Sequence, residues 1–149
     1  MQTRQVLAGS VAIGGGAPVS VQTMTNTDTR DVSATLAQIR RMAEAGADIV
    51  RVSVYDEACA EAVRALVDAS PVPLVADIHF DHRLAIRSIE NGIAKVRINP
   101  GNIGGEANVR ALADCLKQHR IPVRIGVNSG SIEKEILAKY GGVTPQGMV

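Results

Sequence analysis

The stretch PLVADIHF (73–80) decides the fold, because it is a nearly unbroken apolar run with charge only toward its carboxyl end. Strands that are apolar on both faces are typical of parallel sheets covered by helices. Four further stretches have the same character: VSVQTM (19–24), DIVRVSV (48–54), AKVRIN (94–99) and PVRIGVN (122–128). We therefore predict five parallel strands.

Helical patterns fill the intervals between these strands. Asp31 and Asp56 are predicted to cap the first two helices, and Gly46 and Gly92 to end the first and third. The apolar stripes are Val32, Leu36, Ile39 and Ala43; Ala60, Val63 and Val67; Leu84, Ala85 and Ile89; Val109, Leu112 and Leu116; and Ile132, Ile136 and Tyr140, which begin a fifth helix. Strict alternation of strand and helix leaves a (β/α) barrel or an open doubly wound sheet.

Length and loop composition point in different directions here. Five units fit a doubly wound sheet, since eight barrel units would need about 210 residues. Such a sheet has a glycine-rich phosphate loop after its first strand, whereas TMTNTDTRD (23–31) contains no glycine. We therefore predict the α/β class: an incomplete (β/α)8 TIM-type barrel (19–149) after a short N-terminal hairpin or leader (1–18). The strands should lie in sequence order, with helices on one face.

The composition is that of a soluble domain with an aliphatic core. The 149 residues are 46% hydrophobic, with 16 Lys+Arg against 15 Asp+Glu. This balance gives no sign of a nucleic-acid or membrane-surface partner, and neither a membrane span nor a signal peptide is apparent. Cys59 and Cys115 match neither a disulfide framework nor a metal site. We assign them no chemistry and expect a cytoplasmic protein.

Polar side chains interrupt the strands near their carboxyl ends. They stand two or four residues apart, as Arg51 and Ser53, Asp77 and His79, Arg97 and Asn99, and Arg124 and Asn128. Because alternate residues of a strand share a face, these side chains should converge at the top of the barrel interior, where barrel active sites lie. Three arginines against one aspartate favour an anionic, phosphate-bearing ligand. Internal ion pairs are the alternative for each arginine.

Asp77 and His79 are candidates for proton handling; the alternatives are a hydrogen-bonded orienting carboxylate and a core histidine. The loop NPGNIG (99–104) is expected to bring backbone N–H groups close to a phosphate. In an incomplete barrel, interior positions should be poorly buried, and we expect this of Val21, Val52, Val75 and Ile98.

Several longer segments carry a resemblance to a known family. They are VSVQTMTNTDTRD (19–31), GADIVRVSV (46–54), VPLVADIHFDHRLA (72–85), VRINPGNIGG (96–105) and IPVRIGVNSGS (121–131). Together they closely resemble the 4-hydroxy-3-methylbut-2-enyl diphosphate synthase family, the iron–sulfur enzymes of the methylerythritol phosphate route to isoprenoids. The resemblance extends to KYGGVTPQ (139–146) and so covers essentially the whole chain.

The resemblance implies an activity and its partners. Family members hold 2-C-methyl-D-erythritol 2,4-cyclodiphosphate in an N-terminal (β/α)8 barrel, and a C-terminal domain carries a [4Fe–4S] cluster on three cysteines and a glutamate. The cluster takes electrons from flavodoxin or ferredoxin, opens the cyclic diphosphate and removes a hydroxyl as water. In the homodimer, the cluster domain of one subunit closes over the barrel of the other. This chain would be the first part of such an enzyme, without the cluster ligands and inactive alone.

By motif matching, Arg51, Arg97, Arg124 and Asn128 are expected to contact the diphosphate. Asp77 and His79 should line the same pocket, and Asn99 joins the site from its strand position. One alternative is another anion-binding barrel, such as a dihydropteroate-synthase-like enzyme. A second alternative is an inactive half-barrel that self-associates through its strand edges.

Overall fold

The computed structural model describes residues 3–128, 130, 132 and 134–148. The strands are β1 (Val6–Ala8), β2 (Val11–Ile13), β3 (Gln22–Met24), β4 (Ile49–Val54), β5 (Leu74–Ile78), β6 (Lys95–Ile98) and β7 (Val123–Ile125). The helices are α1 (Val32–Glu44), α2 (Glu57–Ala69), α3 (His82–Glu90), α4 (Glu106–His119), α5 (Lys134–Tyr140) and α6 (Pro145–Met148). None of these described helices is both long and apolar enough to cross a bilayer.

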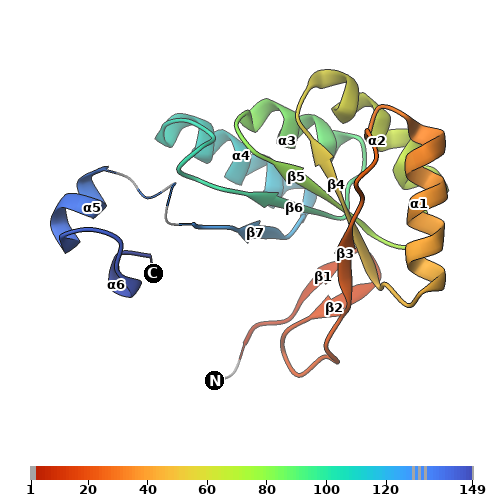
Figure 1. Cartoon of the computed structure of the whole chain (residues 1–149), viewed down its shortest axis with the longest axis horizontal. Helices are drawn as coiled ribbons and strands as arrows, with labels where there is room; N and C mark the ends of the chain where they lie inside the picture. The colour runs from red at the N-terminus through yellow and green to blue at the C-terminus, as the bar shows by residue number, and fades with distance from the viewer. Residues whose placement is uncertain (1–2, 129, 131, 133, 149) are drawn as a thin grey trace.

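The main sheet has five strands in the order β3-β4-β5-β6-β7, and every neighbouring pair is parallel. This confirms the predicted sequential order, which a doubly wound sheet would break at a switch point. Figure 1 shows α1 to α4 together on one side of this sheet, with the antiparallel β1–β2 hairpin on the other. The arrangement is that of a barrel segment.

The two faces of the sheet have different neighbours. Val52, Ala76 and Val96 belong to the main core with the helices. Ile49 and Val75, on the opposite face, pack against Ala8 of the hairpin, which covers the amino end of the inner face. Strand alternation therefore separates a helix-facing aliphatic core from an inner face that becomes polar toward the carboxyl ends.

The expectation of poor burial was wrong for three of four residues. Val52 and Ile98 face the helices rather than the barrel interior, and both are buried. Val75 does lie on the inner face, but the hairpin residue Ala8 covers it. Val21 alone is exposed as expected, because β3 begins only at Gln22.

The predicted helix caps are present. Asp31 Oδ1 accepts a hydrogen bond from the Ala34 N–H at 3.0 Å, and Asp56 Oδ1 accepts one from the Cys59 N–H at 2.8 Å. Asp81, which the sequence reasoning did not single out, caps α3 in the same way. These bonds satisfy amide groups that a helix leaves unpaired at its first turn.

The fifth unit differs most from expectation. The helix α5 begins at Lys134, after Ile132, and a further short helix, α6, follows it. Figure 1 shows both beyond the end of β7 rather than against the sheet. All three residues of β7 are accordingly exposed, and neither α5 nor α6 covers the strand.

Candidate functional site

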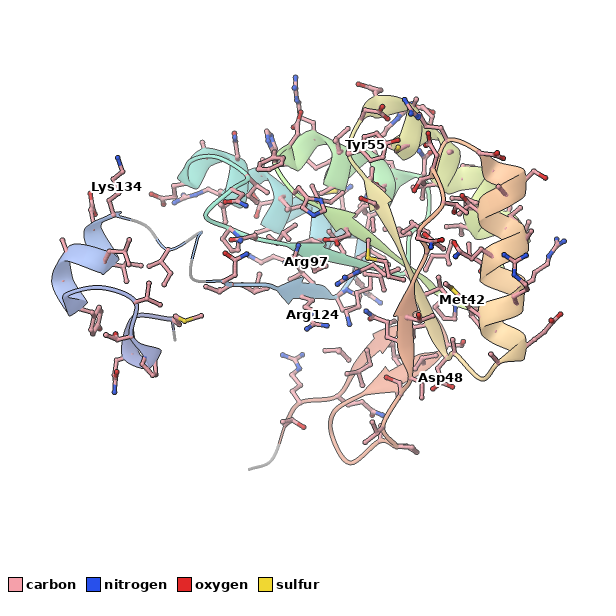
Figure 2. All side chains as sticks on the ribbon, in the orientation of Figure 1. Met42, Asp48, Tyr55, Arg97, Arg124 and Lys134 are labelled. Carbon is pink, nitrogen blue, oxygen red and sulfur yellow. The ribbon has the colours of Figure 1, made fainter. Side chains whose placement is uncertain are left out.

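The inner face carries its polar residues in rows across the strands. The register aligns Ser53 of β4 with Asp77 of β5, Asp77 with Arg97 of β6, and Arg97 with Arg124 of β7. Paired positions of parallel strands share a face, so these four side chains project to the same side. Figure 2 shows Arg97 and Arg124 on the adjacent strands β6 and β7. The predicted convergence of Asp77, Arg97 and Arg124 is therefore present in the backbone register.

Asp77 is the centre of this row. It is 3% exposed, and its Oδ1 accepts a 2.9 Å hydrogen bond from Arg97 Nη1. Its Oδ2 lies 3.5 Å from Arg51 Nε. One buried carboxylate thus contacts two guanidinium groups, which fixes their positions. The internal ion pairs considered for the arginines exist for Arg51 and Arg97.

Two further contacts hold the arginines in place. Arg51 directs its Nε and Nη2 at the sulfur of Met24, at 3.2 and 3.1 Å. The Arg97 guanidinium lies over Gly126, where an added Cβ would stand 2.7 Å from both Nε and Nη2. A side chain at position 126 would therefore displace the Arg97 guanidinium from its observed position. Neither Met24 nor Gly126 was singled out as a contact from the sequence.

Lys95 is a cation that the sequence analysis missed. It is paired with Val75, and Val75 with Arg51, so it lies on the inner face one row closer to the amino ends than Arg97. Burial lowers the pKa of the Lys95 ammonium, and the nearby Arg124 guanidinium lowers it further. The signal was available in the sequence, since Lys95 precedes Arg97 by two residues and must share its face.

The loop after β6 is folded on itself. The side-chain oxygen of Asn99 accepts a 3.2 Å hydrogen bond from the Gly101 N–H, and the Asn99 carbonyl accepts one from Asn102 at 3.0 Å. Asn108 of α4 donates to the Ile103 carbonyl at 3.2 Å, and Ile103 is buried. The backbone N–H groups of Gly101 and Asn102, which were expected to face a phosphate, thus donate hydrogen bonds within the loop.

The remaining candidates follow the carboxyl ends of their strands. His79 follows the end of β5, half-buried, with its ring 6.1 Å from that of Phe80. Asn128 is exposed beyond β7, where its Oδ1 accepts from the Gly130 N–H at 3.0 Å. The structure therefore brings Arg51, Asp77 and Arg97 into contact, and His79, Asn99 and Asn128 come after the carboxyl ends of β5, β6 and β7.

A second charged cluster occupies the carboxyl-end rim of the first strands. The Tyr55 hydroxyl donates to Asp28 Oδ1 at 2.9 Å, and Arg30 binds the same carboxylate at 2.7 Å. The Arg30 hydrogen bonds hold the pKa of Asp28 well below its usual value, and the bond to Asp28 raises the pKa of Tyr55 to about 12. In Figure 2, Tyr55 lies at the opposite end of β4 from Asp48.

The inner face as a whole favours an anion. Within the described strands, its charged residues are the cations Arg51, Lys95, Arg97 and Arg124 and one carboxylate, Asp77. Guanidinium groups bind phosphate oxygens through paired N–H donors, and the surplus of cations is costly without a negative ligand. Phosphate binding is the chemistry that this arrangement supports.

Comparison with known families agrees with the fold and covers nearly all of the chain. The model of the GcpE TIM-barrel domain matches residues 3–149. The chain belongs to the GcpE TIM-barrel family.

Curated relatives of this GcpE segment are similar along its whole length. A protein of Magnetococcus marinus is 60% identical over 148 residues, and one of Ruminiclostridium cellulolyticum is 55% identical over 148 residues. A third, from Caldanaerobacter subterraneus, is 56% identical over 147 residues. Each alignment covers 99% of this chain but only 40%, 42% and 41% of the respective relative. All three are named 4-hydroxy-3-methylbut-2-en-1-yl diphosphate synthase (flavodoxin).

The described part of the GcpE segment contains no group of side chains that fits an iron–sulfur cluster. Within the described residues, no three His, Cys, Asp or Glu side chains are grouped to hold a metal. Cys59 is buried in α2 and Cys115 lies on α4, and burial raises the pKa of both thiols. A raised pKa disfavours the thiolate that a cluster requires.

Proposed function

We propose that this chain forms part of the substrate-binding barrel of an oxidoreductase of isoprenoid biosynthesis. The reaction is the reductive opening and dehydration of 2-C-methyl-D-erythritol 2,4-cyclodiphosphate to 4-hydroxy-3-methylbut-2-enyl diphosphate. Support comes from the names of the relatives and from the cationic inner face. The [4Fe–4S] cluster that family resemblance assigns to the full-length enzyme would be held by residues outside this chain.

The excess of cations around Asp77 is the observation that carries this proposal. Arg51, Arg97 and Arg124 are the proposed diphosphate ligands, and Asp77 keeps two of them oriented before substrate arrives. Preorganised donors bind charge without further reorganisation. Asn99 and Asn128, at the carboxyl ends of the same strands, are the proposed neutral contacts.

Asp77 and His79 are the proposed proton-handling residues. Both oxygens of Asp77 contact guanidinium groups, and an incoming phosphate that attracts Arg51 or Arg97 would free one of these oxygens to contact the substrate. We propose that His79, which follows the end of the same strand, donates a proton to the hydroxyl that leaves as water.

The proposed partners follow from the same relatives. Their names include flavodoxin, and we propose flavodoxin, or ferredoxin in its place, as the electron donor. Residues 1–18 would be the hairpin leader and 19–149 the first part of the barrel in a homodimeric enzyme. Both described cysteines are free thiols, which supports a cytoplasmic location. The family match favours this function over a dihydropteroate-synthase-like barrel or an inactive half-barrel.

A chimaera tests the proposal. Residues 3–149 would replace the matched segment of the Magnetococcus marinus relative, and the purified protein would be assayed with the cyclic diphosphate and reduced flavodoxin. We expect formation of the allylic diphosphate, and its loss when the chimaera also carries Arg97→Ala. A folded chimaera that contains its cluster but makes no product would reject the proposed function.

A further inference from the structure

Lys95 stands apart from the other cations of the inner face by its position. Its row consists of Met24, Arg51, Val75 and Lys95, one step closer to the amino ends than the row of Asp77 and Arg97. Rows two residues apart along a strand are separated by about 6.6 Å. The neighbours Val96 and Ile98 face the helices, so Lys95 and Arg97 project to the inner side.

The charges around Lys95 are nearly all of its own sign. Arg51 comes from β4, Arg97 from β6 and Arg124 from β7, and Arg124 is close enough to lower the pKa of the Lys95 ammonium. Asp77 is the carboxylate on this face, and its two oxygens already contact Arg97 and Arg51. Among the described residues, no carboxylate lies within 4.0 Å of the Lys95 ammonium.

A half-buried ammonium beside a guanidinium is unfavourable unless an anion neutralises both. A ligand that reached only the Arg97 row would leave this repulsion in place. A ligand with two phosphate groups can extend from the Arg97 row to the row below it, and Lys95 and Arg124 are the two cations on this face that Asp77 does not pair.

We propose that Lys95 is a further binding residue for the diphosphate, contacting it from the amino-end side of Arg97. This inference rests on the proposed function, because it assumes the same anionic ligand. Lys95 would attract the diphosphate through its positive charge. Arg51 and Arg97, which Asp77 holds in fixed orientations, would instead bind it through directed hydrogen bonds. The binding effect is assigned to the ammonium group of Lys95 and not to its hydrocarbon stem.

The test is calorimetric titration of the chain with inorganic pyrophosphate. Lys95→Met keeps the length and apolar stem of the side chain and removes its charge, whereas Lys95→Arg keeps the charge. We expect Lys95→Met to weaken pyrophosphate binding about tenfold and Lys95→Arg to restore most of the affinity. Lys117→Met, at an exposed lysine of α4, is the matched control and should bind as the unmodified chain does.

Each outcome distinguishes the two proposals. Equal affinity of Lys95→Met and the unmodified chain, with binding lost in Arg97→Ala, would remove Lys95 from the site and leave the diphosphate site intact. Weak binding by both Lys95→Met and Lys95→Arg, with unchanged circular dichroism and melting temperature, would reject a role by charge. Absence of pyrophosphate binding by the unmodified chain would overturn both the diphosphate site and the role of Lys95.

Discussion

Asp77 and Arg97 lie directly opposite each other on β5 and β6, and Arg97 Nη1 donates a 2.9 Å hydrogen bond to Asp77 Oδ1. The pair orients a guanidinium on an inner face that has more cations than carboxylates. Its geometry connects the fold to the proposed binding chemistry, since strand register alone places the two residues together.

Replacement of Arg97 should weaken binding of the cyclic diphosphate. Loss of charge-assisted hydrogen bonds worth about 1.5–3 kcal/mol corresponds to a roughly ten- to hundredfold weaker Kd for Arg97→Ala. Arg97→Lys should recover only part of this loss, because an ammonium lacks the paired donors of a guanidinium. Calorimetric titration measures both, with the exposed Arg110→Ala as control. Equal affinities of Arg97→Ala and the unmodified chain would return Arg97 to a structural ion pair.

Replacement of Asp77 by Asn should lower the stability of the chain but increase the stabilisation that a bound anion provides. The change leaves Arg51 and Arg97 without their carboxylate and should lower the free energy of unfolding by about 1–3 kcal/mol. Pyrophosphate should then raise the melting temperature of Asp77→Asn by more than that of the unmodified chain, because the ligand supplies the missing negative charge. A smaller shift in the variant would mean that Asp77 is needed chiefly to orient the guanidinium groups.

Gly126→Ala tests whether space beside Arg97 is required. The new Cβ would stand 2.7 Å from Arg97 Nε and Nη2 and would force the guanidinium to move. We expect pyrophosphate affinity to fall at least several-fold with little change in folding, since about 1 kcal/mol of lost contact corresponds to about fivefold. Gly147→Ala is the control, because a Cβ there meets ordinary contacts of 3.4 Å and longer. Unchanged affinity in Gly126→Ala would show that Arg97 can bind from another position.

The contact between hairpin and sheet should contribute to stability. Ile49 is buried against Ala8 and Val75, and Ile49→Ala should lower the free energy of unfolding by about 2–5 kcal/mol through lost burial and the cavity left behind. Urea denaturation followed by circular dichroism measures the change. Val19→Ala, at a residue that is 96% exposed, should have no comparable effect. An Ile49→Ala midpoint equal to that of Val19→Ala would contradict the packing described.

The cluster of Asp28, Arg30 and Tyr55 should make the stability of the chain depend on pH. Bonds from Arg30 lower the pKa of Asp28 from its ordinary 3.8, so the folded state releases this proton more readily than the unfolded chain. Stability from the Asp28 carboxylate is therefore present above about pH 4 and lost as the pH falls. Urea denaturation of Asp28→Asn should show a deficit in the free energy of unfolding at pH 6 that shrinks toward pH 2. Asp114→Asn, at an exposed residue of α4, is the matched control. A constant deficit would exclude the ion pair as its source.

The sequence predicted the elements that local signals determine. Asp31 and Asp56 bond to amides three residues away, so the helix starts were visible from a short window. The row of Asp77 and Arg97 was visible because strand alternation is regular. Lys95 obeys the same alternation but lies closer to the amino ends of the strands, away from the region where a barrel site is expected.

Other features depend on contacts far apart in the chain. Val75 is covered by Ala8, and no local pattern indicates that an N-terminal hairpin closes the inner face. The prediction placed Val52 and Ile98 in the barrel interior. Strand alternation instead directs each of them to the face away from its sequence neighbour, Arg51 or Arg97. The apolar stripe predicted for the fifth helix gave no indication that α5 would lie beyond the end of β7 rather than against the sheet.

The hairpin that seals the amino end of the inner face also constrains the order of folding. Ala8 is separated from both of its partners, Ile49 and Val75, by a long stretch of chain. Contacts between residues so distant in the chain form slowly, because a long loop must close before they are made. We therefore expect the β1–β2 hairpin to dock on the sheet only after β4 and β5 have paired.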